Sequence, residues 1–329
     1  MISSALGLRA RRSTARLLRR WAASTKAPDA VALSFGGSGV RFCFSFCSTT
    51  KERSTDSFLT QLMMMYQFGV ARELARDVRF MRSIKKVHGT SGGAIAGAML
   101  LSCPDRFEDA TDYFATGKWL RGATPRDVLE PHNRLLRRAV RDLDLKTRAD
   151  ALSERFVCHA TSFSRGTFFL GGGRARRRGV QNVAIDSFHD DAEVLDAIAA
   201  SCCLTPQGVP FRGERLYDGG FSDPLPSDPE LDTVAVSILN GKHVDVCPDY
   251  GGTGVAPRYL GSPFLRYSVT PQNARALFET TFLTPKRARA RFDQGQHDAR
   301  AFLAAWHRRK REHHEHDDHA RRAGSRPRA

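Results

Sequence analysis

The amino-acid sequence predicts an α/β fold, in which a sheet carries helices on both of its faces. Short apolar runs with the length of buried strands occur at 31–35 (VALSF), 84–88 (IKKVH) and 233–239 (TVAVSIL). Segments with helical length and apolar spacing occur between them, at 94–101 (AIAGAMLL) and 192–204 (AEVLDAIAASCCL). Strands that alternate with helices in this way are typical of an α/β sheet.

The other segments give weaker signals. Residues 104–152 are charged and helix-prone, with a break at Pro and Gly near 122–125, and 155–173 resembles a hairpin (RFVCHATSF, then TFFLGGG). Residues 271–306 predict one or two helices. From Trp306 the sequence is polar and of low complexity, and we expect disorder there. A metal site among the histidines of this tail is an alternative that has no apolar frame to hold it.

The unusual feature of the composition is a high positive charge, which lies mostly in the two tails. A chain of 329 residues can bury a full core. The net charge is +16, of which residues 1–30 contribute +6 and residues 286–329 contribute +7, so the rest carries only +3. The basicity therefore describes partners of the tails and not the fold.

The cysteines and the apolar runs exclude two classes of protein. The seven cysteines are scattered without a C-x-x-C pair or histidines at zinc spacing, which favours reduced thiols over a disulfide framework. No apolar run reaches the ~18 residues that a membrane-spanning helix needs. We therefore expect neither a disulfide framework nor a transmembrane helix.

Residues 1–30 form a basic Ser/Arg-rich arm with no acid before Asp29. This composition is typical of an organellar transit peptide, so import into a plastid or a mitochondrion is one interpretation. A disordered basic arm is the second. A third is an amphipathic helix on a membrane surface, with an apolar face of Leu6, Leu17, Leu18 and Trp21.

A serine lies between glycines at the end of the second predicted strand, in VHGTSGGAIAGAML (87–100). A strand before Ser91 and a helix after it form the context of a nucleophile elbow with the motif Gly89-Thr90-Ser91-Gly92-Gly93, in which the flanking glycines relieve crowding at a strained turn. The alternative is a glycine-rich start to a buried helix.

Two further glycine-rich elements follow strands. Gly37, Ser38 and Gly39 come after the first strand, where glycines let backbone N–H groups approach a developing negative charge. A dinucleotide fingerprint is disfavoured there, because Phe42 replaces its third glycine. Asp218 precedes Gly219 and Gly220 in ERLYDGGFSDPLP (214–226). Taken alone, this would be an ordinary Asp-Gly turn.

In this order the three elements resemble those of the patatin-like phospholipases, closest to the branch of adipose triglyceride lipase and adiponutrin. The segments that carry the resemblance are LSFGGSGVRF, YQFGVARELARD, GTSGGAIAGA and, above all, DAIAASCCLTPQGVPFRGERLYDGGFSDPLP. It covers roughly residues 31–240. The resemblance implies a three-layer α/β/α sandwich with a mostly parallel central sheet.

The resemblance also implies roles. Ser91 is the expected nucleophile and Asp218 its base, without a histidine, and the backbone of Gly37, Ser38 and Gly39 is the expected oxyanion hole. A desolvated carboxylate can accept a serine proton, which agrees with this assignment. The expected reaction is hydrolysis of fatty-acyl esters of triacylglycerol or phospholipid. The resemblance implies no metal and no organic cofactor. We expect an intracellular protein, peripheral to a membrane or lipid droplet, with no nucleic-acid partner.

Residues 43–64 interrupt the resemblance. Joining Phe42 to Met65 gives LSFGGSGVRFMYQFGVARELARD, which fits the family pattern without a gap. We therefore interpret 43–64 as an insertion, with an unspliced in-frame intron as one origin. The alternative is a lid loop whose Phe44 and Phe46 meet lipid. The family also has a glycine where this chain has Phe42.

Four segments result: the arm at 1–30, an acyl hydrolase domain at 31–240, a helical extension at 241–305, and a disordered basic His-rich tail at 306–329. Two other functions stay open. One is an α/β-hydrolase with a Ser/Asp/His triad, for which His243 and His297 are the candidate histidines. The other is a non-catalytic lipid- or membrane-binding protein, whose site Phe42 and the insertion have spoiled.

Overall fold

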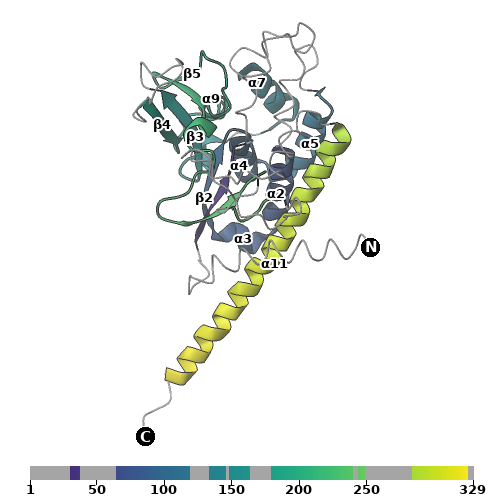
Figure 1. Cartoon of the computed structure of the whole chain (residues 1–329), viewed down its shortest axis with the longest axis vertical. Coiled ribbons are helices and arrows are strands. Elements are labelled where there is room, and N and C mark those ends of the chain that lie inside the picture. Colours follow the sequence, from purple (N-terminus) through teal and green to yellow (C-terminus); the bar gives the residue numbers. More distant parts are fainter. Residues whose placement is uncertain are drawn as a thin grey trace, which may run out of the picture.

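A seven-stranded sheet forms the centre of the protein (Figure 1). The computed structural model describes residues 30–37, 64–118, 133–145, 148–163, 179–239, 244–248 and 284–324. The strands are β1 (Val31–Phe35), β2 (Ile84–Thr90), β3 (Phe156–Phe163), β4 (Val180–Ile185), β5 (Val209–Phe211), β6 (Glu214–Asp218) and β7 (Asp232–Val236). Their order is β5-β6-β3-β2-β1-β7, with β4 also paired to β3. The predicted α/β fold is confirmed.

The central strands β3, β2, β1 and β7 run parallel to one another. Strands β4 and β6 pair antiparallel to β3, and β5 pairs antiparallel to β6. Because β4 pairs with β3 from Cys158 to Phe163, β2 and β6 must share the other edge of β3. Along this edge, the last residue of β2, Thr90, lies opposite His159. The last residue of β6, Asp218, lies opposite the next residue, Ala160. Two strand ends thus meet at consecutive residues of β3.

Helices and short 3-10 turns connect and cover the strands. They are α2 (Met64–Arg76), α3 (Val78–Ser83), α4 (Gly92–Ser102), η3 (Pro104–Arg106), α5 (Phe107–Ala115), α7 (Asn133–Asp142), α8 (Ala149–Leu152), α9 (Asp191–Ser201), η6 (Gly219–Phe221) and α11 (Pro285–Gly324). No helix in the described ranges is both long enough and apolar enough to span a bilayer.

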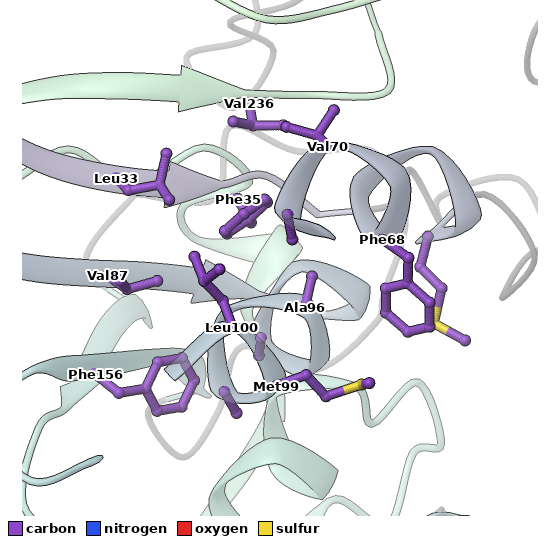
Figure 2. Packing of buried hydrophobic residues seen from close by; sticks show 14 of the residues in the cluster. Leu33, Phe35, Phe68, Val70, Val87, Ala96, Met99, Leu100, Phe156 and Val236 are labelled. Carbon is purple, nitrogen blue, oxygen red and sulfur yellow. The ribbon is translucent and has the colours of Figure 1, made fainter. Parts of the chain in front are cut away.

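The core lies between one face of the sheet and helices α4 and α2. Leu33, Phe35 and Val87 point from β1 and β2 toward Leu100 of α4 (Figure 2). Small residues let α4 approach the sheet closely, since a Cβ on Gly97 would lie 3.1 Å from side-chain atoms of both Val87 and Phe156. Side chains alternate along a strand, so His88 and Thr90 project from the opposite face.

Helix α11 lies along α2, and its second half continues beyond the body of the protein (Figure 1). The two helices cross at glycines: a Cβ on Gly69 would lie 1.9 Å from the Phe292 carbonyl oxygen, and one on Gly295 would lie 2.1 Å from that of Tyr66. The Tyr66 hydroxyl also donates to Asp298. The carboxyl-terminal helix is therefore packed directly against α2.

Three local expectations differ from the structure. Strand β3 forms its antiparallel ladder with β4, Val180–Ile185, whereas the expected second arm at 167–173 lies outside the described residues. The weak polar pattern of β4 hid this pairing. Helix α11 continues to Gly324, where we expected disorder from Trp306. Residues 306–323 contain no glycine or proline and extend a helix already nucleated by its docked half. Helix α2 begins at Met64, the last residue of the proposed insertion.

Candidate active site

Ser91 lies on the turn between β2 and α4. Its backbone has φ 55° and ψ −128°, so it is one of four residues other than glycine with positive φ in the described ranges. Such a conformation costs on the order of 1–3 kcal/mol and persists only where the surroundings hold it. It projects the side chain of Ser91 from the turn, at the amino-terminal end of α4. The strand–turn–helix context expected for a nucleophile elbow is thus present.

The glycines around Ser91 are required by close backbone packing. A Cβ on Gly89 would lie 2.6 Å from the Cα of Ala94, and one on Gly93 would lie 2.3 Å from the carbonyl oxygen of Phe35. Contacts this short exclude any side chain. The glycines therefore let α4 start directly behind the turn and against the end of β1.

Asp218 ends β6 and faces Ser91. The Ser91 hydroxyl donates a hydrogen bond to Asp218 Oδ2 at 2.7 Å, and the Gly220 N–H donates to Oδ1 at 2.8 Å. Asp218 is 3% exposed. Burial raises its pKa from 3.8 to about 7, although both hydrogen bonds oppose the rise. A carboxylate with a pKa near neutrality is suited to accept a serine proton.

The backbone of β3 fixes Asp218 and the glycine that follows it. A Cβ on Gly219 would lie 2.1 Å from the carbonyl oxygen of His159, so only glycine fits there. The Thr161 hydroxyl donates to the Asp218 carbonyl at 2.7 Å. The Asp-Gly-Gly element is therefore a packed junction against β3 and not an isolated surface turn.

The first glycine-rich element lies beside the other two. The N–H of Gly37 donates to the Pro224 carbonyl at 2.7 Å, and a Cβ on Gly37 would lie 3.7 Å from the Cβ of Ser91. This N–H is already bound, so an oxyanion role would fall on Ser38 and Gly39, which lie outside the described residues. Gln67 of α2 donates to the carbonyl of Gly36 at 2.5 Å and ties the loop to that helix.

The described histidines do not complete a triad. His88 Nδ1 lies 2.9 Å from His159 Nε2, His88 Nε2 lies 3.0 Å from Asp228, and His159 Nδ1 contacts Asn182. Burial lowers the pKa of both rings, that of His159 to about 4. In the part of the chain that the structure describes, no histidine hydrogen-bonds Ser91 or Asp218. His297 is exposed on α11, and His243 lies outside the described residues.

Residues at the end of α9, which are not among the predicted site residues, also hold the site. The Ser91 N–H donates to the hydroxyl of Ser201. The Asp218 N–H donates to the carbonyl of Cys203. Burial raises the pKa of the Cys202 thiol well above its usual value, and a hydrogen bond with Ser91 partly opposes this. The only signal in the sequence is the segment ASCCL (200–204), the end of the predicted helix 192–204.

The described part of the chain has no candidate metal site. Within the described ranges, no group of three or more His, Cys, Asp or Glu side chains could hold a metal ion.

A hollow near the start of β1 and β7 lies at the opposite end of these strands from Ser91. Its lining residues are Ala30, Ser227, Asp228, Pro229, Glu230, Leu231, Asp232 and Thr233.

Comparison with known proteins agrees with this geometry. 1-Acylglycerol-3-phosphate O-acyltransferase Pnpla3 of Mus musculus is 40% identical over 79 residues, which are 22% of this chain and 18% of that protein. Patatin-like phospholipase domain-containing protein 2 of Rattus norvegicus is 26% identical over 249 residues, or 73% of this chain and 48% of that protein. The chain spans about half or less of the length of these relatives. The sequence model of the patatin-like phospholipase family matches residues 61–230, slightly more than half of the chain. The resemblance seen in the motifs is confirmed, and the chain belongs to the patatin-like phospholipase family.

Proposed function

We propose that the chain is a serine acyl hydrolase that cleaves fatty-acyl esters of glycerolipids with Ser91 and Asp218. The observation that carries the proposal is the hydrogen bond of 2.7 Å from the Ser91 hydroxyl to a buried carboxyl group. The pKa of Asp218, raised to about 7 by burial, makes this carboxylate a far stronger base than one in water. The two buried histidines, His88 and His159, contact each other, Asp228 and Asn182, and neither bonds to Ser91 or Asp218. This supports a dyad over a triad.

The reaction runs in two halves. Asp218 accepts the Ser91 proton as Oγ attacks the ester carbonyl, and the same proton then goes to the departing glycerolipid oxygen as its C–O bond breaks. Water attacks the acyl-Ser91 ester in the second half. Asp218 accepts the water proton and returns it to Ser91 Oγ, and a fatty acid leaves.

The oxyanion needs stabilisation in both halves. The N–H groups of Ser38 and Gly39 are the proposed donors, because the N–H of Gly37 is bound to Pro224. The amino-terminal end of α4, which starts at Gly92, adds the positive end of a helix dipole.

Acyl transfer is a second outcome of the same chemistry. The Pnpla3 relative is named an acyltransferase, whereas the relative from Rattus norvegicus is named a phospholipase domain-containing protein. An acyl-Ser91 ester can react with a lipid hydroxyl in place of water, so a lysolipid acceptor would compete with hydrolysis. We propose that either reaction takes place at a membrane or lipid-droplet surface, toward which the basic arm at 1–30 would attract the protein.

The test uses the purified chain, a fluorophosphonate probe and fatty-acid release from phosphatidylcholine micelles and triacylglycerol emulsions. Ser91→Ala should abolish labelling and release. Ser83→Ala is a matched control, because Ser83 is also buried and its hydroxyl donates to one carbonyl away from the site. His243→Ala and His297→Ala should keep both activities. Labelling that persists without Ser91, or that disappears with either histidine, would refute the dyad.

A further inference from the structure

The parallel ladder between β2 and β3 is interrupted at Ser91. The N–H of Val87 donates to the Arg155 carbonyl at 2.7 Å, with Val87 opposite Phe156. In a parallel ladder this pattern repeats every second residue, so the N–H of Ser91 would donate to the His159 carbonyl. One residue further along β3, Ala160 pairs with Asp218 of β6 instead. The chain must therefore leave β3 at Ser91 to make room for Asp218.

The hydroxyl of Ser201 fills the interrupted position. Ser91 N–H donates to Ser201 Oγ at 2.8 Å, and Ser201 Oγ–H donates to the His159 carbonyl at 2.6 Å. The side chain is fully buried. A hydroxyl can accept and donate at once, so one side chain replaces the missing ladder bond with two. Neither backbone group is left unpaired where the strands separate.

Ser201 also connects the nucleophile to the segment that holds the base. It is the last residue of α9, and two residues later the Cys203 carbonyl accepts the Asp218 N–H at 2.7 Å. The His159 carbonyl that accepts from Ser201 also packs against Gly219. The end of α9 and one carbonyl of β3 thus fix both sides of the contact between Ser91 and Asp218.

We propose that Ser201 is a positioning residue, which holds the Ser91 turn at the distance from Asp218 that proton transfer requires. This inference rests on the proposed function. Without the hydroxyl, the N–H of Ser91 loses its hydrogen-bond acceptor, and the contact with α9 no longer holds the turn at positive φ. The turn then relaxes toward the His159 carbonyl, and the Oγ to Oδ2 contact lengthens.

The test compares Ser201→Ala with Ser83→Ala, which removes a buried hydroxyl that donates to a carbonyl at the same distance of 2.6 Å. Ser201→Ala should lower kcat by about 10- to 100-fold with little change in KM, as misplacement by a fraction of an ångström to one ångström does. Rates are expressed per folded molecule. Ser83→Ala should leave kcat unchanged.

The pH profile separates positioning from general loss of structure. The hydrogen bond from Ser91 lowers the pKa of Asp218, so a weaker bond should move the acid limb of the kcat profile to higher pH. A wild-type kcat and acid limb in Ser201→Ala would overturn the proposal. An equal loss in Ser83→Ala, or a loss explained entirely by unfolded protein, would also overturn it.

A second variant decides the matter if Ser201→Ala does not fold. Ser201→Cys keeps a group of similar size that is a weaker donor and acceptor, so kcat should be intermediate and the acid limb should move in the same direction. Unchanged kcat and acid limb in Ser201→Cys would overturn the proposal. Ser91→Ala separates the two hypotheses: its retained activity refutes the proposed function, whereas an inactive Ser91→Ala beside a fully active Ser201→Ala refutes only the positioning role.

Discussion

Replacing the buried carboxyl group of Asp218 should reduce activity and raise stability at the same time. In Asp218→Asn the amide keeps the size of the side chain, can accept from the Gly220 N–H and can donate to Ser91 Oγ, but it cannot take the serine proton. Loss of a general base lowers turnover by at least ~10²-fold. The same change removes a charge that the folded protein does not solvate.

The gain in stability follows from the raised pKa. The pKa of Asp218 is about 7 in the folded protein, against 3.8 for the free side chain. Between these values the folded protein holds one more proton than the unfolded chain, so its stability falls by about 1.4 kcal/mol per pH unit as the pH rises. At pH 8 the raised pKa of Asp218 lowers the free energy of unfolding by about 4 kcal/mol in total, and Asp218→Asn does not carry this loss. The advantage of Asp218→Asn should therefore be about 2–3 kcal/mol larger at pH 8 than at pH 5.

Urea denaturation of both proteins at pH 5 and pH 8, with fatty-acid release measured on the same samples, tests this prediction. Asp228→Asn is the contrasting control. Burial raises the pKa of Asp228, but hydrogen bonds from the backbone of Glu230 and Leu231 and from His88 lower it by more. Its replacement should therefore cost stability at pH 8. Near-normal activity in Asp218→Asn, or a loss of stability at pH 8, would refute the reasoning.

Three further predictions concern stability and the insertion. Burial and the neighbouring His88 lower the pKa of His159 from 6.5 to about 4. The folded protein therefore loses about 3 kcal/mol of stability as the pH falls from 6.5 to 4. His159→Gln should reduce this dependence of the free energy of unfolding on pH, measured by urea denaturation. Gly295→Ala places a Cβ 2.1 Å from a carbonyl oxygen of α2 and should lower the free energy of unfolding by ~1–3 kcal/mol, measured the same way. Deletion of 43–63, which keeps Met64 in α2, should leave a folded and more active enzyme, and transcript sequencing checks the intron. A soluble but inactive deletion variant would show that the segment works as a lid.

Local patterns were enough to predict an α/β fold, several of its strands and the three glycine-rich elements at strand ends. Strand β1 was predicted with its observed bounds because five apolar or small residues end directly at glycines. The elbow at Ser91 was predicted from its glycines between a strand and a helix, and the role of Asp218 from the family resemblance; in the structure the glycines at both places stand where backbones approach too closely for any side chain. Such requirements act over a few residues, so the sequence displays them directly.

Other features depend on contacts between distant segments, and no local pattern displays them. Ser201 is 110 residues from Ser91, and its role exists only because β6 displaces β2 from the edge of β3. The polar strand β4 is defined by its partner, and the pKa of Asp218 is set by the burial that the whole fold produces. Composition alone predicted disorder after Trp306, whereas docking of the first half of α11 on α2 nucleates a helix through that segment. The sequence by itself determined which residues are the candidates for the reaction; only the tertiary structure decided how they are held together, because hydrogen bonds and desolvation depend on which chain segments lie side by side.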